Sequence, residues 1–244
     1  LMSDQLVQLD HRLWFPDPPA ALAEPEGLLA IGGDLRPERL LLAYQRGIFP
    51  WSEADQPILW WSPPERAVVE PDTFKASKSL ERILRKNDFS VALDLHFDEV
   101  IMLCQRSRTS QGQGTWITDD MIEAYTLLFE ADKAHCIACF ENTELVGGLY
   151  GVSLDGIFCG ESMFSLVSNA SKVAFAYLAR LCQDLGVGII DCQMPNPHLM
   201  RLGAKPIPRS AFQTMLREPH RAKPWSSLKG WLPSWQTSHP WTAQ

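Results

Sequence analysis

Short apolar runs separated by turn signals predict a group of strands in the middle of the chain. The runs are HCIACFE (135–141), LVGGLYGVS (145–153) and IFCGESMF (157–164), with turns at Asn142-Thr143 and Asp155-Gly156 between them. Short apolar stretches bounded by such dipeptides are typical of consecutive strands. We therefore expect a three-stranded meander over residues 135–164.

Helical periodicity predicts an amphipathic helix over residues 170–185, directly after the meander. Its apolar face is formed by Leu178, Leu181, Cys182 and Leu185. Further helices are expected near 36–46, 77–86, 97–106 and 119–132, and a strand at FSVAL (89–93). A meander that is followed by a helix and another strand predicts an α/β (α+β) fold, built on one mixed sheet.

Helix caps support two of these boundaries and a glycine supports a third. Ser77 and Thr118 are suited to N-cap positions, because their hydroxyls accept hydrogen bonds from the first turn. Gly47 is suited to the C-terminal stop of the 36–46 helix, whose first turn accommodates Pro37.

The strand expected after the long helix, IIDCQ (189–193), ends in polar residues. Side chains alternate across a strand, so Asp191 and Gln193 are expected on one face and Cys192 on the other. A Pro-Asn-Pro turn follows at once, and then a short helix in PHLMRLG. A carboxylate and an amide at the end of an apolar strand are candidates for chemistry.

A second carboxylate lies within the predicted meander. Glu161 stands among apolar neighbours, where an unpaired carboxylate is costly. Alternation places Glu161 and Met163 on one face with Cys159, unless a bulge at Gly160 changes the pattern. A structural role, such as bonding to backbone amides, explains either acid alone. Glu161 and Asp191 together, with Gln193 beside them, favour a functional site.

The composition of the chain divides it into three regions. Residues 1–62 are irregular and rich in Pro and Trp, and GLLAIGGDL within them is a short apolar piece that turns on Gly32-Gly33. We expect a small N-terminal domain over 1–62, a larger catalytic domain over 63–218 and a Trp/Pro-rich tail over 219–244. The tail lacks periodicity, so we expect it to wrap the surface.

The net charge of −7 argues against binding nucleic acid over the whole surface, but basic residues are concentrated locally. Residues 201–229 contain seven Lys/Arg and a single acid, and residues 75–86 contain five Lys/Arg and a single acid. Such clusters suit a phosphate backbone or simply form solvated helix faces. The chain has no apolar run long enough for a membrane span and no signal-peptide pattern, so the cytoplasm is the expected location.

No motif for a metal or a nucleotide cofactor is present. Cys136 and Cys139 form a CxxC beside His135, but no second pair lies nearby and the surrounding run is strand-like. LVGGLYG matches neither of the glycine patterns that bind phosphate, and no Ser-His-Asp or Cys-His nucleophile pattern is found. We expect no metal and no cofactor.

A series of long and unusual blocks then resembles one enzyme family over residues 28–212. The blocks are EGLLAIGGDL, AYQRGIFPW, WWSPPERAVV, GTWIT, LVGGLYGV, FCGESMFS, ASKVAF and IDCQ…HLMRLGA…IPR. They occur in the order found in leucyl/phenylalanyl-tRNA–protein transferases. The resemblance implies a small N-terminal domain and a larger domain with the N-acetyltransferase (GNAT) fold. It also implies transfer of Leu, Phe or Met from aminoacyl-tRNA to the N-terminal Arg or Lys of a protein, which marks that protein for degradation.

The resemblance also implies roles for single residues. Asp191 and Gln193 hold and activate the acceptor α-amine, and Glu161 binds the cationic side chain of the acceptor. An apolar slot for the transferred side chain is formed by Leu149, Phe158, Met163 and Phe175. The terminal adenosine stacks on Trp51 and Trp116, and weaker substrate-site roles fall on Tyr44, Tyr125 and Asn196. For each apolar residue, an ordinary core position is an equally good explanation.

The tRNA backbone contact is predicted from charge density alone. Residues 201–229 form the densest basic run, which favours Arg217, Arg221 and Lys223 over the competing cluster of residues 75–86. The chain departs from the family in QRSRTSQGQGTWIT before Trp116 and in MPNPHLMRLGA, where Arg201 replaces a small polar residue.

Two alternative functions remain at this point. A CoA-dependent N-acyltransferase of the same fold needs a Q/R-x-x-G-x-G/A loop, and SLVSNASK occupies about that place instead. A non-catalytic tRNA-binding adaptor explains the basic clusters, but it does not explain Asp191, Gln193 and Glu161 together. The order of preference among Leu, Phe and Met and the oligomeric state do not follow from the sequence.

Overall fold

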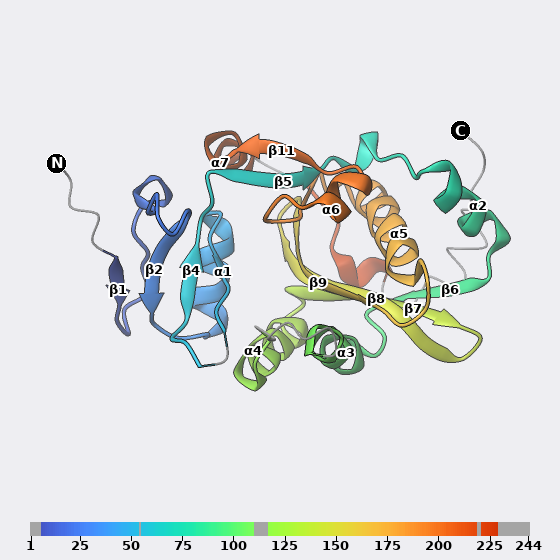
Figure 1. Cartoon of the computed structure of the whole chain (residues 1–244), viewed down its shortest axis with the longest axis horizontal. Coiled ribbons are helices and arrows are strands. Elements are labelled where there is room, and N and C mark those ends of the chain that lie inside the picture. The colour runs from blue at the N-terminus through green and yellow to red at the C-terminus, as the bar shows by residue number, and fades with distance from the viewer. Residues whose placement is uncertain (1–5, 54, 110–116, 219–220, 229–244) are drawn as a thin grey trace.

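The computed structural model describes residues 6–53, 55–109, 117–218 and 221–228, and its strands form two sheets (Figure 1). The first has four strands in the order β1-β2-β4-β3, with β1 parallel to β2 and the other pairs antiparallel. Its strands are β1 (Val7–Leu9), β2 (Leu28–Gly32), β3 (Phe49–Pro50) and β4 (Leu59–Trp61). Helix α1 (Pro37–Gln45) and the 3-10 helix η1 (Pro18–Ala20) complete this part.

Within the described residues, the second sheet has seven strands in the order β11-β5-β10-β9-β8-β7-β6, and only β10 and β9 pair in parallel. Its strands are β5 (Glu65–Val69), β6 (Phe89–Leu93), β7 (Ala134–Glu141), β8 (Glu144–Leu154), β9 (Ile157–Ser165), β10 (Ile189–Asp191) and β11 (Lys205–Pro208). The predicted α/β fold on a mixed sheet is therefore confirmed.

Helices cover both faces of the larger sheet, as Figure 1 shows. On one face lie α3 (Phe97–Thr109) and α4 (Asp119–Glu130), and on the other lies α5 (Ala170–Leu185). The remaining helices are α2 (Lys78–Lys86), α6 (Pro197–Arg201) and α7 (Arg209–Arg217), with 3-10 turns η2 (Pro71–Thr73) and η3 (Trp225–Leu228). Among the described residues, no helix is both long enough and apolar enough to cross a membrane.

The apolar side chains form two cores, one on each side of this sheet. Phe97, Tyr125 and Tyr150 belong to the core under α3 and α4, whereas Leu149 and Phe175 belong to the core under α5. Residues of the N-terminal part, such as Leu40 and Trp60, extend the first core, so the smaller sheet packs against the α4 side. The domain boundary at Ser62 remains a prediction.

Most of the predicted helices and strands are confirmed because their signals are local. Ser77 Oγ accepts a hydrogen bond from the Leu80 amide, and Thr118 Oγ1 accepts one from the Met121 amide, as the caps predicted. The helix over 170–185 has the predicted bounds, and the two hairpin turns use the left-handed backbone of Asn142 and Gly156.

Two predictions about the elements are wrong. The described part of residues 1–62 is not irregular, because it forms a sheet whose strands are only two to five residues long. The strand predicted at 189–193 ends at Asp191, and Gln193 adopts a left-handed backbone with φ of 62°. The alternation expected between Asp191 and Gln193 therefore does not apply.

A β-bulge in β9 changes the expected alternation around Glu161. Tyr150 pairs with Ser162 and Gly151 pairs with Gly160, so Glu161 is the extra residue. Gly151 allows the close approach at this point, because a Cβ there would lie 2.3 Å from the Cys159 carbonyl oxygen. The bulge places both Glu161 and Ser162 beside the same cavity.

Candidate active site

A cavity of about 320 Å³ lies where the pairing of β9 and β10 ends. The last paired residues are Cys159 and Asp191. The walls come from β8 and β9, from α5, from the segment after β10 and from the N-terminal part. The lining residues are Phe49, Trp51, Leu149, Tyr150, Gly160, Glu161, Ser162, Met163, Phe175, Leu178, Ile190, Cys192, Gln193, Met194, Asn196, His198 and Leu199.

Asp191 is fully buried, and its charge is balanced by Arg66 from β5. Arg66 Nε donates to Asp191 Oδ1 over 3.2 Å, and Arg66 Nη2 donates to Oδ2. The guanidinium also donates to the Gly47 carbonyl oxygen over 2.9 Å and lies between the rings of Phe49 and Phe212. Both carboxylate oxygens are therefore held by a cation that is itself fixed on every side.

Gln193 connects this buried ion pair to Glu161. Its backbone amide donates to Asp191 Oδ1, and its side-chain Nε2 donates to Glu161 Oε1, each over 2.9 Å. Asp191 itself does not line the cavity, whereas Gln193 does. The bond from the Gln193 amide to Asp191 Oδ1 therefore connects the buried ion pair to the cavity wall, and a catalytic role for Asp191 stays a prediction.

Glu161 is a buried carboxyl whose surroundings favour the protonated form. Burial raises its pKa to about 8 and outweighs the hydrogen bonds from Tyr44 and Tyr125, which lower it. The Tyr125 hydroxyl donates to Glu161 Oε2 over 3.0 Å, and the Tyr44 and Tyr125 hydroxyl oxygens are 2.5 Å apart. Burial and the charge of Glu161 raise the pKa of both tyrosines, so they remain neutral donors.

Three of the four residues expected in an apolar slot line the cavity. Leu149, Met163 and Phe175 do so, together with Leu178 and Ile190. Phe158 does not: its ring is fully buried and packs against Trp225 at 5.1 Å between centroids. Phe158 is therefore a core residue outside the cavity lining in this structure, and its place in the slot stays a prediction.

The other candidates are distributed around the cavity. Trp51 lines the cavity with 42% of its surface exposed, and Trp61 packs against its edge. Tyr44 and Tyr125 are buried beyond Glu161 and do not line the cavity, whereas Asn196 does and also caps α6. Trp116 lies outside the described residues.

Comparison with known proteins gives one consistent result. Residues 68–217 match the model of the leucyl/phenylalanyl-tRNA protein transferase family, and residues 33–64 match the model of its N-terminal domain. Leucyl/phenylalanyl-tRNA–protein transferase of Pseudoalteromonas atlantica is 50% identical over 94% of this chain and 97% of its own length. That of Syntrophotalea carbinolica is 50% identical over 87% of this chain and 91% of its own length.

This chain belongs to the leucyl/phenylalanyl-tRNA–protein transferase family. It is therefore a tRNA-dependent aminoacyltransferase. Among solved structures, the chain is similar to L-PGS from Bacillus licheniformis, with a TM-score of 0.41 and 14% identity over 69% of this chain and 53% of that chain. A GCN5-related N-acetyltransferase from Kribbella flavida has a TM-score of 0.35 and 12% identity over 68% of this chain and 59% of that chain.

Sequence reasoning about this transferase missed Arg66. The residue lies in the block WWSPPERAVV, but its role depends on a contact with Asp191, which is distant along the chain. One signal was available: a carboxylate buried at the end of an apolar strand requires a cation, and Arg66 opens the apolar run of β5.

The basic clusters of the transferase lie in two different settings. Segment 75–86 begins beside Phe74, whose ring packs at 5.9 Å from the cavity residue Phe175. Lys78, Arg82 and Lys86 are exposed and lie one turn apart on α2. Within the cavity wall, burial lowers the pKa of His198, and the charges of Lys172 and Arg201 lower it further. The cavity therefore has basic residues beside it.

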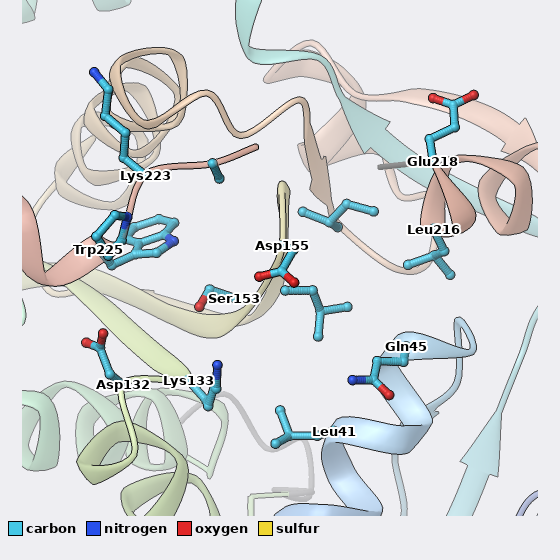
Figure 2. Close-up of a pocket in the computed structure, with 14 residues that line it drawn as sticks. Leu41, Gln45, Asp132, Lys133, Ser153, Asp155, Leu216, Glu218, Lys223 and Trp225 are labelled. Atoms are coloured by element: carbon cyan, nitrogen blue, oxygen red, sulfur yellow. The ribbon is translucent and has the colours of Figure 1, made fainter. Parts of the chain in front are cut away.

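Arg217, Arg221 and Lys223 are also exposed, and their chain neighbours Leu216, Glu218 and Ala222 line a second cavity of about 550 Å³ (Figure 2). Lys223 lines this second cavity, and its Nζ donates to the Asp184 carbonyl oxygen over 3.1 Å. Figure 2 shows Asp155 in the middle of the lining, with Asp132 and Glu218 on either side. These three carboxylates reduce the attraction of the second cavity and of Lys223 for a polyanion.

Proposed function

We propose that this transferase moves Leu, Phe or Met from aminoacyl-tRNA to the α-amine of an N-terminal Arg or Lys. A peptide bond forms, and the acceptor protein is marked for proteolysis. The observation that carries the proposal is the hydrogen-bonded series Arg66–Asp191–Gln193–Glu161, which ends at an apolar cavity. Buried polar groups at one wall and apolar side chains at the other suit an amine and a hydrophobic acyl group.

The polar wall is suited to a cationic acceptor. Glu161 offers a buried carboxyl, and a guanidinium or ammonium group that enters the cavity would stabilise its ionised form by charge-assisted hydrogen bonds. The side-chain oxygen of Gln193 remains available to orient the α-amine while its Nε2 bonds Glu161. These two residues distinguish an acceptor that begins with Arg or Lys from a neutral one.

The reaction is aminolysis of an ester that is already activated. The amine nitrogen attacks the carbonyl carbon of the 3′-ester, and the tetrahedral intermediate then expels the 3′-oxygen of the tRNA. The proton lost by the amine ends on that oxygen, and either Asp191 or a tRNA hydroxyl takes it first. Positioning of the amine is the main contribution of the polar wall.

Met163 provides a test of the acyl slot. It is half-buried and lines the cavity, so Met163→Ala should widen the slot and raise the ratio of Phe transfer to Leu transfer by about threefold or more. The measurement is kcat/KM for each aminoacyl-tRNA. The matched control is Met215→Ala, because Met215 is equally half-buried but lies outside the cavity. An unchanged ratio in Met163→Ala contradicts the assignment.

For the tRNA backbone, Arg217, Arg221 and Lys223 remain one candidate surface, and segment 75–86 is the second. The position of Phe74 beside Phe175 favours the second, because its basic residues start next to the cavity wall.

Charge reversal on α2 should decide between the two surfaces. Lys78→Glu/Arg82→Glu/Lys86→Glu is expected to weaken aminoacyl-tRNA binding by about tenfold or more. The slope of log affinity against log salt should fall by roughly 0.7–0.9 for each lost phosphate contact. The matched control is Arg217→Glu/Arg221→Glu/Lys223→Glu. A loss of affinity and slope in the control alone would assign the tRNA to that surface instead.

A CoA-dependent acyltransferase is the alternative of the same fold class. It needs a glycine-containing loop before the helix that follows β9, and this chain gives little support for such a loop. The segment between β9 and α5 is LVSN, with Asn169 in a left-handed backbone, and it has no glycine. Acetyl-CoA is therefore the matched donor control in the assay of transfer.

A further inference from the structure

Ser162 is a buried polar residue in the wall of the active-site cavity that no role described above uses. It follows Glu161 at the bulge of β9, and only 8% of its surface is exposed. Its hydroxyl has no hydrogen-bond partner in the part of the chain that the structure describes. Buried hydroxyls in proteins are nearly always hydrogen-bonded, so an unused one beside a cavity indicates a partner that enters with the substrate.

The neighbours of Ser162 restrict what that partner is. Glu161 on one side is the residue for the cationic acceptor, and Met163 on the other side belongs to the acyl slot. All three residues line the same cavity, and the ester carbonyl of the aminoacyl-tRNA must enter it together with the amine and the acyl side chain. Once the acceptor cation has ionised Glu161, this carboxylate cannot donate to a carbonyl oxygen, and Asp191 does not line the cavity, whereas the Ser162 hydroxyl can donate.

The geometry points to Ser162 as a catalytic residue whose hydroxyl donates a hydrogen bond to the carbonyl oxygen of the aminoacyl ester. This inference rests on the proposed function. When the amine nitrogen bonds to the carbonyl carbon, the electron pair of the C=O bond moves onto that oxygen. Ser162 donates to the resulting oxyanion and keeps its proton. Collapse of the intermediate restores the C=O bond and breaks the bond to the 3′-oxygen, which takes the proton lost by the amine.

Such a donor is worth most in the transition state, because the oxygen carries its full charge only there. Ser162→Ala should therefore lower kcat for Phe transfer to an Arg-initiated peptide by about 100-fold, with KM for Phe-tRNA changed by less than about twofold. Its melting temperature should not fall, because the substitution removes a buried hydroxyl that has no partner in the free protein.

The matched control is Ser62→Ala. Ser62 is also buried, its hydroxyl also has no partner among the described residues, and it does not line the cavity, so its transfer rate should equal that of the wild type. Ser162→Cys keeps a weak donor, so its kcat should lie between those of the wild type and Ser162→Ala. It replaces Ser162→Ala in the comparison if the alanine variant is less stable.

The outcomes separate the two claims. A wild-type protein that transfers no Phe overturns the proposed function. A wild type that transfers Phe, with Ser162→Ala or its cysteine replacement at the wild-type kcat, overturns only the role of Ser162. A loss that appears in KM with kcat unchanged also overturns it, because a group that acts on the oxyanion must change kcat.

Discussion

Arg66→Met is expected to destabilise the fold by about 3–5 kcal/mol. The substitution leaves the Asp191 carboxylate fully buried without its cation, and breaking a buried ion pair from one side has this cost. The fold tolerates the buried charge of Asp191 only because Arg66 binds both of its carboxylate oxygens. The rings of Phe49 and Phe212 pack against the guanidinium of Arg66. The measurement is the free energy of unfolding from urea titration at pH 7.

A double variant distinguishes an unpaired charge from lost packing. Arg66→Met/Asp191→Asn removes both charges and keeps an acceptor for the Gln193 amide, so most of the stability should return. Transfer activity should stay low, because the oxygen that fixes Gln193 is no longer charged. Arg46→Met is the control: its ion pair with Asp17 is exposed, and the expected loss is below about 1 kcal/mol. A loss as small as this in Arg66→Met would mean that the buried pair does not hold the site.

Glu161→Gln is expected to reduce kcat/KM for an Arg-initiated acceptor by about 100-fold. The variant keeps the size of the side chain but cannot ionise to pair with the guanidinium. A peptide that begins with citrulline, the neutral analogue of Arg, is the matched acceptor. The wild type should prefer Arg over citrulline strongly, whereas Glu161→Gln should prefer it weakly or not at all. Equal preference in both proteins would show that Glu161 does not read the acceptor charge.

The raised pKa of Glu161 also predicts how acceptor binding by the wild type and by Glu161→Gln depends on pH. Below about pH 8 the carboxyl of the free enzyme is protonated, and a bound cation favours its ionised form. Acceptor binding therefore releases a proton, and the affinity of the wild type should rise with pH up to about 8. The α-amine of the acceptor titrates in the same range, so Glu161→Gln, which retains only the amine contribution, gives the baseline.

The stability of the free protein should fall as pH rises, whereas its affinity for the acceptor should increase. Because burial raises the pKa of Glu161 from 4.5 to about 8, the folded state binds a proton that the unfolded state releases. The stability linked to this proton is fully present below about pH 4.5 and is lost as pH rises through 8. The melting temperature of the wild type should therefore fall relative to that of Glu161→Gln across this window.

The parts of the fold that were predicted from sequence depend on local signals. The caps at Ser77 and Thr118 and the periodicity of α5 are carried by residues close together in the chain, and the structure has these elements as predicted. The N-terminal sheet escaped prediction because its strands are too short to show alternation. The larger sheet also gains β5 and β11, which are joined to it only by distant pairings.

In the candidate site, too, features with a local sequence signal were predictable and contacts between distant residues were not. Glu161 and Gln193 are predictable as unusual polar residues in apolar surroundings, and a direct hydrogen bond joins them. The ion pair of Asp191 with Arg66 and the contact of Phe158 with Trp225 are not predictable, because each joins residues more than sixty positions apart. The bulge at Glu161 was foreseen only as an option at Gly160, since a register shift depends on the partner strand.

The most direct test of the account is transfer of labelled Phe from Phe-tRNA to a peptide that begins with Arg. The account predicts one new peptide bond at the α-amine, no transfer to an otherwise identical peptide that begins with Ala, and no acetylation when acetyl-CoA replaces the tRNA. Absence of Phe on the Arg peptide, or acetyl transfer in its place, would contradict the account.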